Sequence, residues 1–215
     1  MAYVISMLTQ KGGAGKSTIS VHLSACLAVL HPHLSVAVGD ADPQASATAW
    51  IKRGNGAAGI TVHPVAVDGE GKLLKNEIEA IGADIVVLDL PPVLESIALR
   101  SALRSDLILI PVLPSIIDLS ATKGAVAVAQ EAIEFAPNKK FLLIPNRVQN
   151  NTAIGRELRS VLEQWGPVSH ATICQRIALS ESAAHGLGIS QFAPESPAAA
   201  EIRQLAEEVS EILGI

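Results

Sequence analysis

Residues 3–18 read YVISMLTQKGGAGKST, an apolar run that leads directly into a glycine-rich loop. The apolar part, Tyr3–Leu8, has the length and the β-branched content of a buried strand. The loop, Gln10–Thr18, contains a Lys-Ser pair at the point where a helical pattern begins. Glycines permit backbone torsions that aim successive N–H groups at one anion, and a helix N-terminus adds partial positive charge. The stretch therefore predicts a strand, a phosphate-binding loop and a helix, in that order.

The rest of the chain repeats this alternation of strand and helix. Further strand candidates lie at Ser35–Gly39, Ile60–Val65, Ile85–Leu88, Leu107–Val112 and Phe141–Ile144. Helical spacing is found at Lys16–Leu30, Ala45–Arg53, Lys72–Ile81, Leu94–Ser101, Leu119–Phe135, Ala153–Trp165 and Ala198–Leu213. We therefore expect one α/β domain over residues 1–215, a doubly wound, mainly parallel sheet with helices on both faces. Between Val168 and Pro197 the pattern is weaker; a short strand is expected near Ala171–Cys174 and a loop around Ser180–Gly188.

The composition limits the classes of function. Apolar residues make up 49% of the chain and aromatic residues only 3%, so the core must be built mainly from Val, Ile, Leu and Ala. A net charge of −5 means that bulk charge alone does not hold this protein on nucleic acid. Cys26 and Cys174 have no metal-ligand spacing, and no apolar run reaches the roughly 18 residues of a membrane helix. We expect a soluble cytoplasmic protein without a signal sequence and with reduced cysteines.

The loop and two aspartates form a candidate site for phosphoryl-transfer chemistry. Lys16 can neutralise β and γ phosphate oxygens, and the Ser17 hydroxyl can ligate Mg²⁺. Asp40 and Asp89 each follow a predicted strand, and the carboxyl ends of parallel strands gather at the edge where the loop lies. Carboxylates there can hold a metal and orient water, although a lone aspartate after a strand also serves as a helix cap. The predicted phosphate contacts are Gly12, Gly13, Ala14, Gly15, Lys16, Ser17 and Thr18, and the predicted metal site is Ser17, Asp40 and Asp89.

The loop departs from the common pattern GxxxxGK[ST] in two ways. Gln10 stands where that pattern has its first glycine, and Lys11 adds a second lysine. In both respects KGGAGKST resembles the deviant Walker A motif of the ParA/MinD group of P-loop ATPases. The resemblance implies ATP or ADP with Mg²⁺ as ligand. It also implies a homodimer bridged by ATP, in which Lys11 acts on the partner subunit's nucleotide while Lys16 and Asp40 act in catalysis.

Other segments extend the resemblance in family order. DADPQ at residues 40–44 is similar to the switch motif whose first aspartate positions the hydrolytic water, which implies that role for Asp40. VVLDLPP at residues 86–92 is similar to the Walker B segment, which implies that Asp89 holds Mg²⁺. Asn146 and Arg147 lie in a PNR segment that resembles the adenine-recognition loop. PVLPS with Asp118, and RIALSES with His185 and Gly186, match two further family segments.

The resemblance implies a switch that positions a cargo. The chain is nearest the small, ParF-like plasmid partition ATPases, which lack an N-terminal helix-turn-helix region. In such proteins the ATP-bound dimer binds DNA non-specifically and associates with the nucleoid. Hydrolysis is slow until a small DNA-binding adaptor of the ParB or ParG kind stimulates it. The window from Lys139 to Arg176 has six basic and two acidic residues. Its candidate DNA contacts are Arg156, Arg159 and Arg176, and a solvated charged face is the alternative.

Three other functions compete with this interpretation. A membrane-cycling positioning ATPase resembling MinD would need a basic amphipathic C-terminal helix, but Glu195–Ile215 carries five glutamates and only Arg203. A redox ATPase resembling nitrogenase iron protein would need cluster-ligating cysteines, and neither cysteine lies where these are expected. A small-molecule enzyme resembling dethiobiotin synthetase would share the fold but not the DADPQ and SES segments. We therefore expect partition or positioning of plasmid DNA or another large cargo, without membrane binding.

Overall fold

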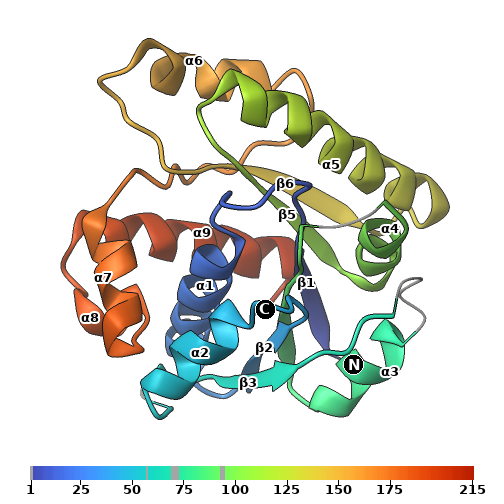
Figure 1. The fold of residues 1–215 in the computed structure, drawn as a ribbon, viewed down its shortest axis with the longest axis vertical. Coiled ribbons are helices and arrows are strands. Elements are labelled where there is room, and N and C mark those ends of the chain that lie inside the picture. Colours follow the sequence, from blue (N-terminus) through green and yellow to red (C-terminus); the bar gives the residue numbers. More distant parts are fainter. Residues whose placement is uncertain (1, 57, 69–72, 93–94) are drawn as a thin grey trace.

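Six parallel strands form the central sheet in a computed structural model that describes residues 2–56, 58–68, 73–92 and 95–215 (Figure 1). The strand order is β3-β2-β4-β1-β5-β6, and the neighbouring pairs are all parallel. The strands are β1 (Tyr3–Met7), β2 (Val36–Asp40), β3 (Thr61–Pro64), β4 (Ile85–Asp89), β5 (Leu107–Val112) and β6 (Lys140–Pro145). The six strands predicted between Tyr3 and Ile144 are each confirmed to within one residue at either end.

Helices cover both faces of this sheet, as expected. On one face lie α1 (Lys16–Leu30), α2 (Ser46–Arg53), α7 (Ile177–His185), α8 (Ile189–Phe192) and α9 (Pro197–Leu213). On the other lie α3 (Leu74–Ile81), α4 (Glu95–Arg104), α5 (Ile116–Phe135) and α6 (Ala153–Leu162). The doubly wound α/β architecture is thus confirmed, with β1 at the point where the strand order changes direction.

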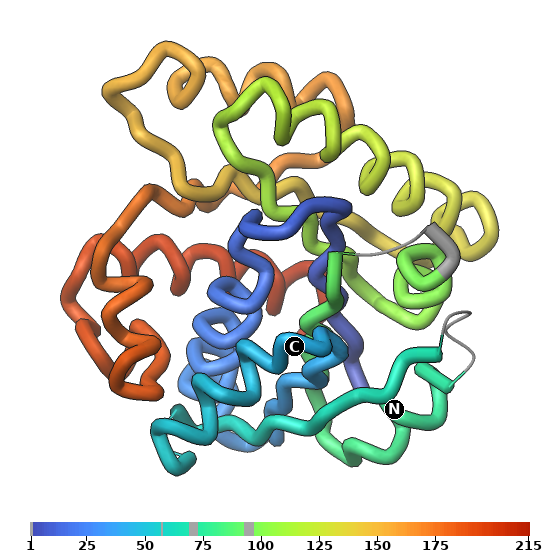
Figure 2. The backbone as a smooth tube through the Cα atoms, viewed as in Figure 1, coloured from blue at the N-terminus to red at the C-terminus, as the bar shows by residue number. Residues whose placement is uncertain are grey.

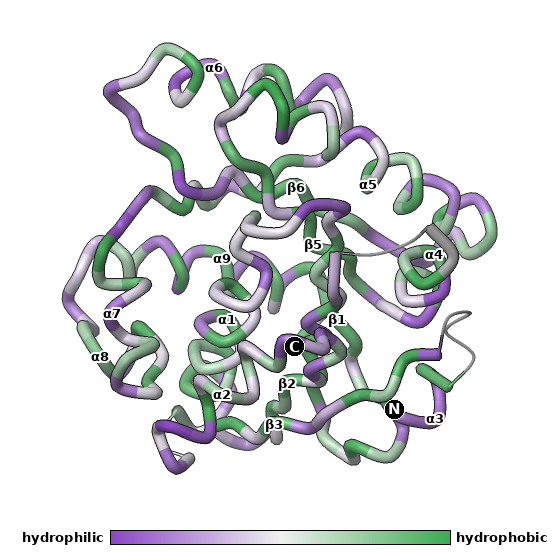
Figure 3. The backbone as a smooth tube through the Cα atoms, in the orientation of Figure 1, coloured by the Kyte–Doolittle hydropathy of each residue, from purple (hydrophilic) through white to green (hydrophobic). Residues whose placement is uncertain are grey.

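Two hydrophobic cores separate these layers, one on each face of the sheet. Along β1, Ile5 and Met7 point into the core beneath α1, whereas Val4 points into the core beneath α4 and α5. Because neighbouring side chains of a strand point to opposite faces and both faces are covered, the central strands are apolar throughout. The helices instead alternate between hydrophobic and hydrophilic residues along the chain (Figure 3).

The first and last helices pack against each other although they are far apart in sequence (Figure 2). Ile202, Leu205 and Val209 of α9 are buried in the same core as Leu23 and Leu27 of α1. The apolar face of the C-terminal helix is therefore covered by protein. Among the residues that the structure describes, no helix is long and apolar enough to cross a membrane.

The segment between α6 and α9 differs most from the prediction. The loop expected around Ser180–Gly188 is wrong, because these residues mostly belong to α7 and end at the α7 C-cap Gly186, where φ is 68°. Serines have modest helix propensity, and α7 is stabilised by packing on α2 and α8. The strand expected near Ala171–Cys174 is also wrong, since the segment makes only isolated parallel bridges at Val168 and Cys174.

Helix ends differ from the prediction by a few residues. The predicted starts at Lys72 and Leu94 lie outside the described residues. The helix expected from Leu119 begins three residues earlier, at Ile116. The helix expected to reach Trp165 ends as α6 at Leu162, and the chain then continues in tighter turns.

Candidate functional site

The glycine-rich loop joins the end of β1 to the start of α1, as predicted. Gly13 and Gly15 have φ values of 82° and 88°, a region that side chains with a Cβ rarely adopt. Lys16 is buried, and its Nζ donates to Thr9 Oγ1 at 3.1 Å and to the Lys11 carbonyl at 3.4 Å. Burial lowers the pKa of the Lys16 ammonium, while the nearby carboxylates of Asp89 and Asp42 oppose this shift. A buried cation held by two neutral oxygens is well suited to accept an anionic ligand.

The loop forms one wall of an open hollow of about 700 Å³. Its other walls come from the segment after β2, from the start of α2 and from the two prolines after β4. A second hollow of about 420 Å³ lies on the side of β6 and α7 and shares Gly15, Thr18 and Arg147 with the first. The two hollows therefore meet over the start of α1. A phosphate chain in the first and a nucleoside in the second would fit this arrangement.

Asp89, at the end of β4, is a buried carboxylate with few hydrogen bonds. Its Oδ1 accepts from Ser20 Oγ at 3.4 Å, and its buried Oδ2 has no hydrogen-bond partner among the residues that the structure describes. Burial raises the pKa of Asp89 to about 7; the charge of Asp40 adds to the shift, and Ser17 and Lys16 oppose it. An orphaned buried carboxylate oxygen beside the Ser17 hydroxyl fits a Mg²⁺ ion, which would restore the ionised form.

The described residues contain no group of three or more His, Cys, Asp or Glu side chains that could enclose a metal by themselves. This agrees with the chemistry of Mg²⁺, which usually takes one or two protein ligands together with phosphate oxygens and water. The Ser17 hydroxyl lies close enough to Asp89 to oppose the rise of its pKa, so these two predicted metal ligands are neighbours at the loop. Asp40 lies one strand away, opposite Asp89 in the register of β2 and β4.

Asp40 also serves as a cap for α2. Its Oδ2 accepts from the backbone N–H and the hydroxyl of Thr48 at 2.8 and 2.7 Å, and its Oδ1 accepts from the Asp42 N–H at 3.2 Å. The capping interpretation that the sequence left open is therefore correct. The role of Asp40 in positioning water stays a prediction. In that role, the direction of the Asp40 carboxylate would depend on the position of the start of α2.

The residues that make the loop unusual both contact α5. Lys11 Nζ forms an ion pair with Asp118 Oδ1 at 3.4 Å. The Gln10 side chain lies directly on Gly124, where an added Cβ would overlap it. The first residues of the loop thus lie against the N-terminal half of α5, and the Lys11 ammonium is engaged within its own subunit.

Asn146 and Arg147 follow β6 and close the loop from the other side. Asn146 is buried; its Nδ2 donates to the Ala14 carbonyl at 2.7 Å, and its Oδ1 accepts from the Arg147 N–H at 2.9 Å. The Asn146 amide therefore holds the loop in this structure, and its role in reading adenine stays a prediction. Arg147 has a φ of 50° and an exposed side chain between the two hollows.

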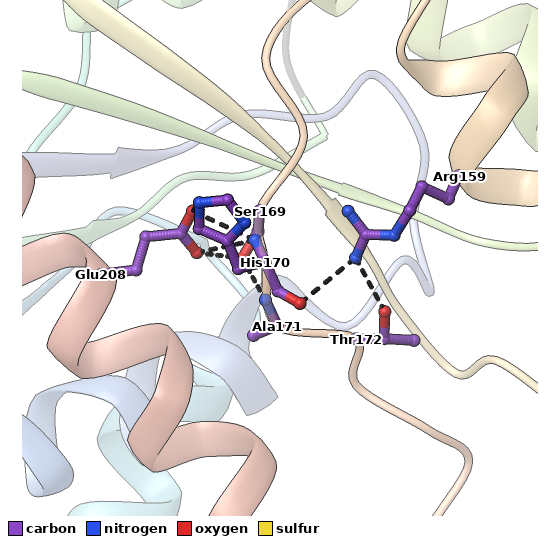
Figure 4. A network of polar contacts seen from close by, with 6 residues as sticks. All are labelled: Arg159, Ser169, His170, Ala171, Thr172 and Glu208. Carbon is purple, nitrogen blue, oxygen red and sulfur yellow. Dashed lines mark hydrogen bonds and ion pairs between the residues drawn. The ribbon is translucent and has the colours of Figure 1, made fainter.

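The three candidate DNA-binding arginines have different surroundings. Arg159 donates to the His170 carbonyl at 3.2 Å and to Thr172 Oγ1 at 3.1 Å, in a network that Glu208 of α9 extends (Figure 4). Arg176 forms an ion pair with Glu201 at 2.7 Å. Arg156 is exposed, with one long contact of 3.4 Å to the Asn150 carbonyl. Two of the three guanidinium groups are therefore engaged in contacts within the chain, although both remain partly exposed.

Sequence reasoning missed three residues that shape this site. Thr9 accepts a hydrogen bond from Lys16, and the sequence feature that could have indicated it is a hydroxyl residue directly before the loop. His22 and Trp50 contact each other edge to face at 5.0 Å and link the helices around the site. Neither residue belongs to a local motif, because their partners are more than 100 residues away.

Comparison with known proteins agrees with this geometry. The model of the CobQ/CobB/MinD/ParA nucleotide binding domain matches residues 5–189. The chain belongs to this family. Maintenance of carboxysome distribution protein A from Halothiobacillus neapolitanus is 30% identical over 211 residues, covering 97% of this chain and 96% of that protein. The chromosome-partitioning ATPase Soj of Thermus thermophilus is 28% identical over 237 residues, covering 95% of this chain and 94% of that protein.

The fold also matches solved structures of the MinD/ParA type. The septum site-determining protein MinD of Pyrococcus horikoshii, complexed with Mg-ADP, superimposes with a TM-score of 0.78 at 22% identity and covers 100% of this chain and 98% of that one. The ParA/MinD P-loop fold predicted from the loop is thereby confirmed. The matched family is described as a nucleotide binding domain.

Proposed function

We propose that this ParA/MinD-family protein is a switch ATPase that hydrolyses ATP to ADP and phosphate, closes as a homodimer around ATP, and positions a large cargo on DNA. The observation that carries the proposal is that a buried Lys16 lies near the carboxylate of Asp89, whose Oδ2 has no partner within the described part of the chain. One group is a cation and the other a carboxylate, and both lie where a phosphate chain and its Mg²⁺ would sit.

The residues of this chain would divide the work of hydrolysis. The backbone N–H groups of the loop and Lys16 would hold the phosphates, and Ser17 and Asp89 would hold Mg²⁺, which neutralises developing negative charge. Asp40 would orient the attacking water. Turnover in the isolated protein is expected to be slow, because no arginine of the matched motifs corresponds to an arginine finger, and a partner protein would complete the site.

Lys11 would act after release from Asp118. The ion pair between them is only partly buried and spans 3.4 Å, so breaking it costs little. A phosphate group of a second subunit would offer the ammonium a stronger partner than one carboxylate. This supports a site in which each subunit supplies Lys11 to the other.

The cargo would be selected by the adaptor that recognises the dimer. Relatives of this chain include a carboxysome distribution protein and a chromosome-partitioning ATPase, so a protein assembly and a DNA molecule are both candidate cargoes. We infer a small DNA-binding adaptor of the ParB or ParG kind, and a nucleoid-associated form in the presence of ATP. Plasmid partition is one case of this activity.

Membrane cycling is a weaker candidate. The apolar face of α9 is buried against α1, and its outward glutamates would repel anionic lipid. A membrane-bound form would need another segment to contact lipid. The proposal therefore names DNA and not a bilayer as the surface on which the protein moves.

The first test of this function is nucleotide binding and surface binding in parallel. Binding of a fluorescent ATP analogue with Mg²⁺ should be lost in Lys16→Ala and kept in Lys139→Ala, a substitution away from the loop. Co-sedimentation with plasmid DNA should require ATP, and co-sedimentation with anionic liposomes should not occur. Unchanged affinity of Lys16→Ala would contradict the nucleotide site, and ATP-dependent liposome binding would favour the membrane alternative.

The DNA surface is tested by charge reversal at Arg156. Arg156→Glu should weaken ATP-dependent DNA binding and reduce its salt dependence, because one phosphate contact per subunit is lost. Arg104→Glu, on the exposed part of α4, is the control. Arg159 and Arg176 are unsuitable for this test, since their reversal would also break internal bonds. Equal effects of the two reversals would place the DNA surface elsewhere.

A further inference from the structure

The C-terminal ends of α2 and α7 touch through two glycines. A Cβ added to Gly54, the C-cap of α2, would overlap the Gly186 carbonyl, and a Cβ on Gly186 would overlap the Gly54 backbone nitrogen. No other residue type permits this approach of two backbones. The contact therefore gives a physical reason for a glycine at position 186, in the segment whose sequence resembled a family motif without a known chemical role.

Two side chains of α2 fix the same contact. The Trp50 indole Nε1 donates to the Leu187 carbonyl at 3.1 Å, and an Arg53 guanidinium nitrogen donates to the Ala183 carbonyl at 3.0 Å. Ala183 lies in the last turn of α7, where its carbonyl also accepts from the N–H of the C-cap Gly186, and Leu187 follows directly after that cap. Thus α2, a helix of only eight residues, is attached at its far end to α7.

In turn, α7 is attached to the helix that follows the phosphate loop. His22 of α1 is fully buried; its Nε2 contacts the Leu179 carbonyl at 3.1 Å, and its Nδ1 accepts from the Ile189 N–H at 2.9 Å. These two bonds require a neutral imidazole with the proton on Nε2. The same ring contacts Trp50 edge to face. The elements α1, α7, α8 and α2 are therefore linked around one histidine–tryptophan pair.

The near end of α2 holds Asp40 through Thr48. The direction of the Asp40 carboxylate therefore depends on the position of α2, and that position depends on α7. We infer that Gly54, Gly186 and Trp50 are positioning residues for ATP hydrolysis, which act by seating α2 so that Asp40 faces the phosphate site. This inference rests on the proposed ATPase function.

The sharpest test is Gly54→Ala. Gly54 has φ −79° and ψ −2°, which alanine adopts without strain, so this substitution perturbs only the contact with Gly186. Single-turnover hydrolysis should slow by about tenfold or more, while the affinity for ATP changes by less than about twofold, because the phosphate loop is untouched. In an Asp40→Asn background the same substitution should have no further effect on hydrolysis.

A matched pair of glycine variants separates the effect of a steric overlap between α2 and α7 from the effect of backbone strain. Gly186→Ala and Gly82→Ala replace glycines with φ values of 68° and 69°, but a Cβ at Gly82 meets open space. Both variants pay the same conformational penalty, and only Gly186→Ala should lose hydrolysis. Melting temperatures of all variants are measured alongside, and rates are taken well below them.

Trp50→Phe covers the case in which the glycine variants do not fold. It keeps an aromatic ring beside His22 and removes only the indole donor to Leu187. Its hydrolysis should fall several-fold with ATP affinity retained. Wild-type hydrolysis in folded Gly54→Ala, or in Trp50→Phe, would overturn the inference. If the unmodified protein fails to bind or hydrolyse ATP, the proposed function itself is contradicted.

Discussion

Asp89 is the residue at which burial and charge oppose each other most directly. Its folded pKa of about 7 is above the ordinary value of 3.8, so the ionised carboxylate destabilises the fold. This cost is fully present above pH 7 and disappears as the pH falls toward 4, because the folded state then binds the proton. The site therefore stores an unfavourable charge that a bound cation would relieve.

We predict that Asp89→Asn stabilises the nucleotide-free protein at pH 8, by up to about 4 kcal/mol if the whole electrostatic cost is removed. Urea unfolding at pH 8 measures this change. Asp84→Asn is the contrasting control, because Asp84 accepts two hydrogen bonds from Ser35 that lower its pKa, and its loss should destabilise. A destabilised Asp89→Asn variant would contradict the account of the orphaned carboxylate.

His22 predicts the opposite dependence on pH. Burial lowers its pKa to about 4, and a protonated ring would point a second N–H at the Ile189 donor. The stabilising effect of neutral His22 is complete above pH 6.5 and is lost as the pH falls through 4. The loss at pH 4 should be about 3 kcal/mol.

His22→Gln, which cannot titrate, isolates this term. The difference in unfolding free energy between wild type and His22→Gln is measured from pH 8 to pH 4, so that other titrating groups cancel. The wild type should lose its advantage below pH 6.5. A difference that stays constant over this range would show that His22 is not held neutral in the fold.

At the scale of elements, α6 offers a test of local capping. Thr152 is its N-cap, and its Oγ1 accepts from the Gly155 N–H at 3.1 Å. Thr152→Ala should therefore cost about 1 kcal/mol of stability. Ser115 precedes α5 in the same extended conformation but makes no capping bond, so Ser115→Ala should be nearly neutral. Equal losses in urea unfolding would contradict the capping assignment.

The elements also show how far sequence reasoning reaches. All six strands were predictable, because buried parallel strands are apolar runs and need no knowledge of their neighbours. The loop, Asp40 and Asp89 were predictable for a related reason, since parallel strands bring their carboxyl ends together whatever the details of packing. The helix α7 was not predicted, because its serines have modest helix propensity and its contacts with α2 join residues more than 100 positions apart in sequence.

The site residues also divide into those that local sequence indicates and those whose contacts are long-range. Local patterns indicate Lys16 and Ser17, whose roles depend on neighbours in the loop. The engagement of Lys11 by Asp118, of Asn146 by Ala14 and of Arg176 by Glu201 depends on residues far away in sequence. For Arg159 and Arg176 this changes the interpretation, because a basic stretch that resembled a DNA surface is partly an internal network.

At the scale of the whole molecule, one chain contains half of the proposed ATP site. Lys16, Ser17 and Asp89 gather within one chain, whereas Lys11 is held by Asp118 on its own subunit. Both arrangements can be correct if ATP brings two subunits together and Lys11 then changes partner. Nucleotide binding, dimerisation and DNA binding would in that case occur in a fixed order.

The most direct test is the mass of Asp40→Asn in solution with Mg²⁺ and ATP. Asparagine keeps an oxygen to cap Thr48 but cannot act as the water-positioning carboxylate, so the ATP-bound form should persist. Light scattering should give twice the 22.4 kDa of one chain with ATP and a single chain with ADP. With Lys11→Ala added, the protein should bind ATP and stay a single chain. A single-chain mass for Asp40→Asn with bound ATP, or a dimer without Lys11, would contradict the two-chain site.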